Sequence, residues 1–230
     1  MEEYVDKLAI GTYRVEKSVT KNVILDALKH NIRRIDTANL YKNEIEVGSA
    51  IKECDVVRED LHITTKVHPR YATLKKAAVS IERSLESLGT YADTLLVHRP
   101  DVWGQDPSTH PMHIEATWKI MEAYNLEGSV KKIGVSNFTE KEIEHLMTYA
   151  IIKPFVNQIC INDTKFPTEE TISCCRKYNI KIEGYSPFGG VGGPLISEAC
   201  SPVDLLKKRL ELADYVVFGG SHEHSVKTLF

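Results

Sequence analysis

The sequence predicts an α/β protein that folds as one closed (β/α)8 barrel, the TIM-barrel architecture, over residues 1–230. Short β-rich runs alternate with amphipathic helical runs, and eight such units can be counted. Strict alternation of this kind implies parallel strands joined by right-handed crossovers. The length of 230 residues suits a compact form of this barrel, which typically takes ~250 residues.

In the first half of the chain, each expected strand is followed by a helix with one apolar face. The segment KNVILDALKH places Ile24 and Leu28 on the same side of a helix. The helix over residues 73–88 has the clearest apolar stripe, and Gly89 follows it as a stop signal. The expected strands are Leu8–Ile10 (closed by Gly11), Ile32–Thr37, Leu61–Lys66 and Asp93–Val97, and the expected helices are Lys21–His30, Glu44–Glu53, Thr73–Leu88 and His113–Leu126.

The second half repeats the pattern. Thr139 is the expected N-cap of one helix, and Pro202 opens another. The last helix starts near His222 and is expected to be truncated, because Phe230 falls inside it. The expected strands are Lys132–Val135, Phe155–Ile159, Lys181–Tyr185 and Tyr215–Phe218, and the expected full helices are Thr139–Ala150, Thr168–Tyr178 and Pro202–Ala213.

An open, doubly wound sheet is the alternative arrangement of such units. That fold favours a glycine-rich turn after the first strand. Here the turn reads Gly11-Thr12-Tyr13-Arg14, and no G-x-G-x-x-G pattern lies near it. The closed barrel is therefore the preferred prediction.

Composition excludes several classes of protein. The 29 Lys and Arg residues against 32 Asp and Glu residues give a net charge of −3, which argues against an electrostatic nucleic-acid binder. No apolar run approaches the ~18–20 residues that span a bilayer. The start, Met-Glu-Glu-Tyr, lacks the features of a secretory signal. We therefore expect a cytoplasmic protein without a membrane or nucleic-acid partner.

The cysteines are expected to be free thiols. Their odd number and irregular spacing do not indicate a disulfide framework. The adjacent Cys174 and Cys175 are interpreted as two small helix residues rather than a redox pair, because helix neighbours point in different directions. The five cysteines are Cys54, Cys160, Cys174, Cys175 and Cys200.

Four ionisable side chains are expected at adjacent strand ends. Asp36, Lys66 and His98 end the second, third and fourth strands, and Tyr41 lies in the loop after Asp36. The carboxyl ends of the strands carry the active site of this fold. Each residue also has an ordinary structural interpretation, as a cap, a loop aromatic, a solvated strand end or a satisfied core histidine. Their joint placement favours a catalytic site.

This set suits acid–base chemistry on a carbonyl oxygen. A tyrosine has a pKa of about 10, and a nearby ammonium in a dry pocket favours the phenolate. The expectation is that Lys66 lowers the pKa of Tyr41 until it serves as a general acid or base near neutral pH. Asp36 would keep Lys66 charged, and His98 would orient the substrate. A cofactor must supply the hydride, because no side chain can.

These segments resemble the aldo-keto reductase family. The stretch from Ile35 to Gly48 is similar to its D-T-A-x-x-Y-x-N-E-x-x-V-G signature, Thr65-Lys66 to its T-K strand end, and the stretch from Leu95 to Asp101 to its L-x-H-x-P-D strand end. The resemblance implies that Tyr41 is the proton donor. It also implies that Lys66 and Asp36 tune the tyrosine and that His98 orients the carbonyl.

Other segments of the resemblance imply a nicotinamide cofactor. Ser136-Asn137, in a G-V-S-N-F match, and Gln158, in a V-N-Q match, would bind the carboxamide, and Tyr185, in a Y-S-P match, would stack on the ring. Gly11-Thr12 resembles the family's G-T-W, with Tyr13 in place of tryptophan. The expected substrate pocket is walled by Tyr13 and Trp103 with Tyr41 and His98.

The last strand departs from the family pattern. Gly219-Gly220-Ser221 would hold a phosphate through backbone N–H groups, but the usual lysine and arginine are missing at the matched positions. Lys227, His222 or His224 would substitute for them, and NADP(H) is expected over NAD(H) by analogy. Neither His222-x-His224 nor His110-x-x-His113 is expected to bind a metal, since further ligands are missing nearby.

The sequence thus predicts an NAD(P)H-dependent oxidoreductase that reduces the carbonyl of aldehydes or ketones, its partner being a small-molecule carbonyl substrate. The final helix is expected to be short and to lack the closing C-terminal loop of the family. A catalytically weak cofactor-binding or scaffold protein built on the same barrel is therefore the alternative. The glycine-rich segment 189–193 is either a cofactor-covering segment or a shortened loop. A phosphate-binding isomerase would explain Gly219–Ser221 but leaves Tyr41 without a role.

Overall fold

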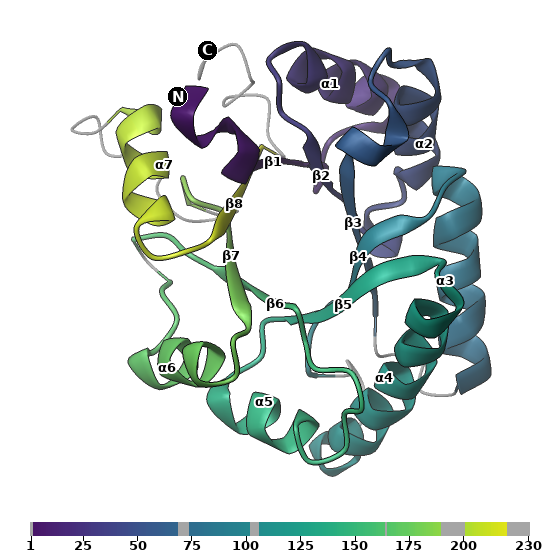
Figure 1. Cartoon of the computed structure of the whole chain (residues 1–230), viewed down its shortest axis with the longest axis vertical. Helices are drawn as coiled ribbons and strands as arrows, with labels where there is room; N and C mark the ends of the chain where they lie inside the picture. Colours follow the sequence, from purple (N-terminus) through teal and green to yellow (C-terminus); the bar gives the residue numbers. More distant parts are fainter. Residues whose placement is uncertain (1, 69–73, 102–105, 164, 190–200, 220–230) are drawn as a thin grey trace.

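The expected closed barrel of eight parallel strands is confirmed by the computed structural model, which describes residues 2–68, 74–101, 106–163, 165–189 and 201–219. Each strand pairs with its sequence neighbours, and β1 pairs with β8 (Figure 1). The strands are β1 Leu8–Gly11, β2 Arg34–Asp36, β3 His62–Val67, β4 Ala92–Val97, β5 Val130–Ser136, β6 Val156–Cys160, β7 Lys181–Tyr185 and β8 Tyr215–Gly219.

Helices surround the strands on the outside of the barrel (Figure 1). The α-helices are α1 Lys17–Lys29, α2 Glu44–Glu53, α3 Leu74–Leu88, α4 His110–Glu127, α5 Glu140–Leu146, α6 Glu169–Lys177 and α7 Pro202–Leu210. Short 3-10 helices are η1 Glu2–Lys7, η2 Asn39–Tyr41, η3 Arg58–Asp60 and η4 Pro107–Thr109. The helical start expected from His222 lies outside the described residues.

Four helix ends differ from the prediction by three residues or more. Helix α7 ends at Leu210 instead of Ala213. Helix α1 begins at Lys17 and α4 at His110, because polar and proline residues in their first turns carry no apolar period. Helix α5 ends at Leu146, and further along the chain the backbone N–H groups of Ile151 and Ile152 donate to the Glu122 carboxylate at 2.8 and 2.9 Å. The cap at its other end is confirmed, for Thr139 forms a capping box with the helix.

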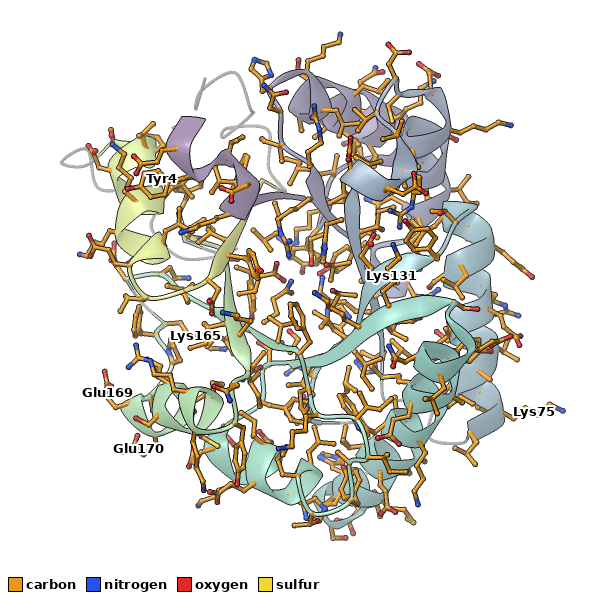
Figure 2. The ribbon with its side chains drawn as sticks, in the orientation of Figure 1. Tyr4, Lys75, Lys131, Lys165, Glu169 and Glu170 are labelled. Carbon is orange, nitrogen blue, oxygen red and sulfur yellow. The ribbon has the colours of Figure 1, made fainter. Side chains whose placement is uncertain are left out.

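The apolar core lies between the strands and the helices. In α4, for example, Trp118 and Met121 are fully buried, and this helix packs on β5. Side chains also fill the centre of the barrel, while labelled charged residues such as Lys75 and Glu169 lie at its periphery (Figure 2). The described cysteines are free, as expected, and Cys200 lies outside the described residues. In the described part of the chain, no helix has the length and apolar character that crossing a membrane requires.

Close packing of α2 on α3 depends on a residue without a side chain. A Cβ atom at Gly48 would lie 2.3 Å from the backbone carbonyl oxygen of Ser87 and 2.9 Å from that of Leu88. Backbone atoms of a packed helix cannot move aside as a flexible side chain can. The two helices approach this closely only because the residue is glycine.

We expect Gly48→Ala to lower the free energy of unfolding by about 1–3 kcal/mol, as overpacked sites do. Without a clash, alanine would raise the free energy of unfolding by about 1 kcal/mol, because it favours helix more than glycine does. A decrease therefore indicates that the new Cβ atom clashes with the backbone of α3. Urea denaturation provides the measurement. Ser49→Ala, at the exposed neighbour in the same helix, is the control. Equal or greater stability of Gly48→Ala would show that the helices have room to spare.

Candidate active site

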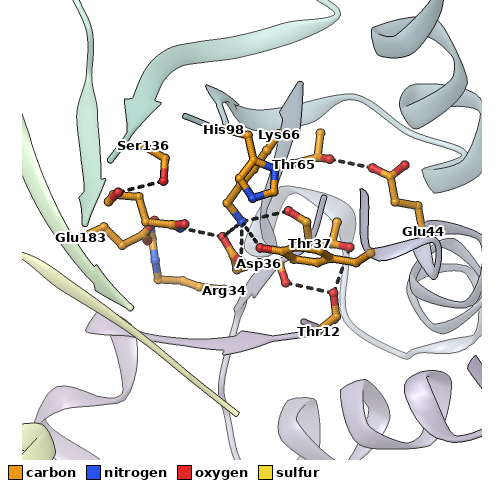
Figure 3. A network of polar contacts seen from close by, with 12 residues as sticks. Thr12, Arg34, Asp36, Thr37, Glu44, Thr65, Lys66, His98, Ser136 and Glu183 are labelled. Atoms are coloured by element: carbon orange, nitrogen blue, oxygen red, sulfur yellow. Dashed lines mark hydrogen bonds and ion pairs between the residues drawn. The ribbon is translucent and has the colours of Figure 1, made fainter. Parts of the chain in front are cut away.

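A buried ion pair lies at the centre of the candidate site. Lys66 on β3 is 1% exposed, and its Nζ donates to both carboxylate oxygens of Asp36 on β2, at 2.6 and 2.7 Å (Figure 3). The same ammonium donates to the backbone oxygen of Thr37 at 3.1 Å and to the Tyr41 hydroxyl at 3.3 Å. The pair forms because β2 and β3 are neighbouring parallel strands whose carboxyl ends meet.

Tyr41 and His98 complete the cluster that the sequence predicted. Tyr41 ends the 3-10 turn η2, and His98 follows β4, where its backbone N–H bonds to the Val67 oxygen. The two rings meet edge to face, with centroids 5.6 Å apart. The Tyr13 ring lies 5.1 Å from that of Tyr41 on the other side. The fold therefore brings Asp36, Tyr41, Lys66 and His98 together.

The expected lowering of the tyrosine pKa is wrong. Burial raises the pKa of Tyr41 to about 12, because loss of water penalises the phenolate more than Lys66 stabilises it, and Asp36 adds to the rise. Burial also disfavours the charged form of Lys66, but Asp36 and Tyr41 outweigh it and raise the lysine pKa. Lys66 thus keeps its charge, and Tyr41 keeps its proton.

His98 is held in its neutral form. Burial lowers its pKa from 6.5 to about 2, and the charge of Lys66 adds to this effect. In the part of the chain that the structure describes, its Nδ1 atom is buried without a hydrogen-bond partner. A neutral imidazole carries one N–H donor, so His98 can orient an oxygen atom but is not itself an acid at neutral pH.

A cavity of about 460 Å³ opens beside these residues. Lys66 and Thr12 are not among the residues that line it; Thr12 is fully buried, and its Oγ1 donates to Thr37 Oγ1 at 2.9 Å. Trp103, Gly220 and Ser221 lie outside the described residues. The predicted residues on the wall are Gly11, Tyr13, Asp36, Tyr41, His98, Ser136, Asn137, Gln158, Tyr185 and Gly219.

Polar groups from β5, β6 and β7 form one side of this cavity. The Tyr185 hydroxyl donates to Asn137 Oδ1 at 2.7 Å, and Asn137 Nδ2 donates to Ser136 Oγ at 3.0 Å. Ser136 Oγ in turn donates to the backbone oxygen of Gln158 at 2.8 Å. Asn137 adopts a left-handed backbone conformation, with φ of 63°, which asparagine tolerates better than most residues. An aromatic ring and several amide groups therefore face one space.

Two buried carboxylates were missed. Glu183 on β7 is 2% exposed and accepts from Gln158 Nε2 at 2.7 Å. Glu44, at the start of α2, accepts from Thr65 Oγ1 at 2.6 Å. Burial raises the pKa of both. The sequence signal for Glu183 was an acidic residue in the middle of an expected strand, and Glu44 stood in the quoted signature without a role.

Among the described residues, no three His, Cys, Asp or Glu side chains gather as a metal site requires. Arg99 was also missed, although it lies on the cavity wall. Its Nε donates to Asp101 at 2.6 Å.

Comparison with known proteins decides the family. The family model described as "Aldo/keto reductase family" matches residues 7–197. The chain belongs to the aldo/keto reductase family. A D-galacturonate reductase of Hypocrea jecorina is 34% identical over 212 residues, which are 84% of this chain and 67% of that protein.

Solved structures of aldo/keto reductases share the fold. One from Brucella melitensis superposes with a TM-score of 0.80 and 28% identity, covering 92% of this chain and 81% of that one. A Bombyx mori aldo-keto reductase in complex with NADP gives a TM-score of 0.70 and 28% identity, covering 90% and 73%. This aldo/keto reductase spans between 60% and 70% of the length of several curated relatives.

The neutral state of His98 makes stability depend on pH. Below pH 6.5, His98 binds a proton in the unfolded chain, whereas in the folded chain it stays neutral down to about pH 2. The stability of the fold therefore falls as the pH falls through this range. Between pH 7 and pH 5, we expect the free energy of unfolding of His98→Gln to fall by about 2 kcal/mol less than that of the parent protein. Urea unfolding at the two pH values provides the measurement. Exposed His145→Gln is the control. A loss as large in His98→Gln as in the parent would refute the assignment.

Proposed function

We propose that the protein is an NADP(H)-dependent reductase of the carbonyl group of small aldehydes or ketones, with Tyr41 as the proton donor. The observation that carries the proposal is the Tyr41 hydroxyl, on a cavity wall and 3.3 Å from the buried Lys66 ammonium. The NADP bound by the Bombyx mori relative supports the choice of cofactor. The reductase name of the Hypocrea jecorina relative supports the class of reaction.

The residues on the cavity wall fit a nicotinamide. Tyr185 offers an aromatic face to a flat heterocycle, and Ser136, Asn137 and Gln158 offer the polar atoms that a carboxamide needs. Gly11 and Gly219 are paired across β1 and β8, so this part of the wall is bare backbone. When bound, the reduced nicotinamide supplies the hydride for the substrate carbon. Gly220 and Ser221 would extend the site to the phosphates.

Tyr41 would deliver the proton to the carbonyl oxygen. Its hydroxyl keeps the proton at neutral pH until the substrate oxygen gains negative charge. Lys66 then stabilises the phenolate that remains, and Asp36 keeps Lys66 charged throughout. Neutral His98 donates its N–H to the same oxygen and fixes the direction of the carbonyl. Each donor is in place before the charge develops.

Binding and turnover test this proposal separately. Titration with NADPH and with NADH, followed by protein fluorescence, measures affinity, and we expect the tighter binding for NADPH. Loss of NADPH absorbance with a panel of aldehydes measures turnover. Binding without turnover would support the catalytically weak scaffold instead, and no binding of either cofactor would overturn both functions.

Replacing Tyr41 by phenylalanine removes the proton donor and little else. We expect turnover to fall by about 10²–10⁴-fold, the usual contribution of a general acid, while affinity for NADPH stays within about twofold. Tyr124→Phe, which removes an exposed hydroxyl bonded to Glu82 on the outer helices, is the control. Unaltered turnover in Tyr41→Phe would refute the role.

A further inference from the structure

The Gln158 side chain is held between two carboxylates. Its Nε2 donates to Asp36 Oδ2 at 2.6 Å and to Glu183 Oε2 at 2.7 Å. A primary amide nitrogen carries two hydrogens, so both donors are committed to these contacts. What the Gln158 amide can still offer to a ligand in the cavity is its carbonyl oxygen, an acceptor.

Glu183 is itself firmly placed. Its Cα is paired with that of Gln158 across β6 and β7, so the two side chains project from the same side of the sheet. Its Oε1 lies 3.5 Å from Arg34 Nη2, and the Arg34 guanidinium stacks over the Tyr215 ring at 3.9 Å. Figure 3 shows Glu183 beside Arg34, on the side of Asp36 away from Thr12. The Glu183 carboxylate thus contacts Gln158 through one oxygen and Arg34 through the other.

Reversal of the Gln158 amide would be unfavourable in this setting. The carbonyl oxygen would then face two carboxylate oxygens at hydrogen-bond distance with no hydrogen between them. Asp36 alone would hold one amide hydrogen, but its Oδ2 is also shared with Lys66. Glu183 takes the second hydrogen and so removes the remaining freedom of the group. None of these contacts gives Glu183 access to a substrate.

We propose that Glu183 is a positioning residue for cofactor binding. By accepting one Nε2 hydrogen, it turns the Gln158 carbonyl oxygen toward the cavity, where that oxygen accepts the N–H of a nicotinamide carboxamide. This inference rests on the proposed function. The inference adds that the site favours a cofactor with an amide N–H group. Glu183 produces this preference without contacting the cofactor or the substrate.

Glu183→Gln tests the role, because Arg34 attracts the oxygen of the new amide and turns its NH2 toward Gln158. That arrangement favours the reversed Gln158. The readout is the dissociation constant, by fluorescence, for NADPH and for its 3-acetylpyridine analogue, in which a methyl group replaces the amide NH2. We expect the variant to bind NADPH about tenfold more weakly, the worth of one hydrogen bond. Affinity for the analogue should change less than about twofold.

Two further variants separate positioning from a general structural effect. Glu44→Gln makes the same change at another buried carboxylate, one that bonds to Thr65 and Ser84, and should leave the ratio of the two affinities unchanged. Glu183→Asp keeps the charge and should restore part of the preference for NADPH. This variant also tests the inference if Glu183→Gln does not fold.

Four outcomes decide the case. If Glu183→Gln weakens the binding of NADPH and of its analogue equally, Glu183 is only a structural residue. If it weakens the binding of neither, Glu183 has no role in binding. Each of these results overturns the inference and leaves the proposed function standing. Failure of the parent protein to bind NADPH would overturn the proposed function, and the inference with it. Selective weakening toward NADPH supports both.

Discussion

The contact on which the site depends is the buried ion pair of Lys66 and Asp36. A charge removed from water is expensive unless a partner and further hydrogen bonds compensate it. Here both carboxylate oxygens face the ammonium, and Gln158 adds a third donor to Asp36. The pair leaves Lys66 charged in the barrel interior, 3.3 Å from the Tyr41 hydroxyl.

Burial, more than the charge balance of this pair, determines the protonation of Tyr41 and His98. An isolated ammonium would pull the tyrosine toward its phenolate, but a paired one does not overcome the loss of water around the phenol. The same burial, with the same lysine nearby, leaves His98 neutral. The resting site is therefore a set of donors around one position, each with its proton in place. Such an arrangement favours an oxygen that is gaining negative charge over one that is neutral.

Local patterns sufficed to predict much of the fold and the meeting of the four residues. Helix and strand periods are short-range properties, and the rule that parallel strand ends converge placed Asp36, Lys66 and His98 together. What was missed depends on contacts between distant segments. The partnership of Glu183 with Gln158 needs the β6–β7 register, and the burial of Thr12 needs its contact with Thr37. The pKa of Tyr41 was predicted with the wrong sign, because a sequence shows which charges are near but not how much water is lost.

The protonation of Tyr41 in the resting protein is the most direct test of this account. Carbon-13 NMR of protein labelled at the tyrosine ring carbon bearing the hydroxyl, with Tyr41→Phe to assign the signal, follows the phenol from pH 6 upward. We expect the Tyr41 signal to stay at its protonated position through pH 10 and to move only near a pKa of about 12. A signal that titrates between pH 7 and pH 9 would mean that Lys66 acts as an uncompensated charge, and the role assigned to Asp36 would be wrong.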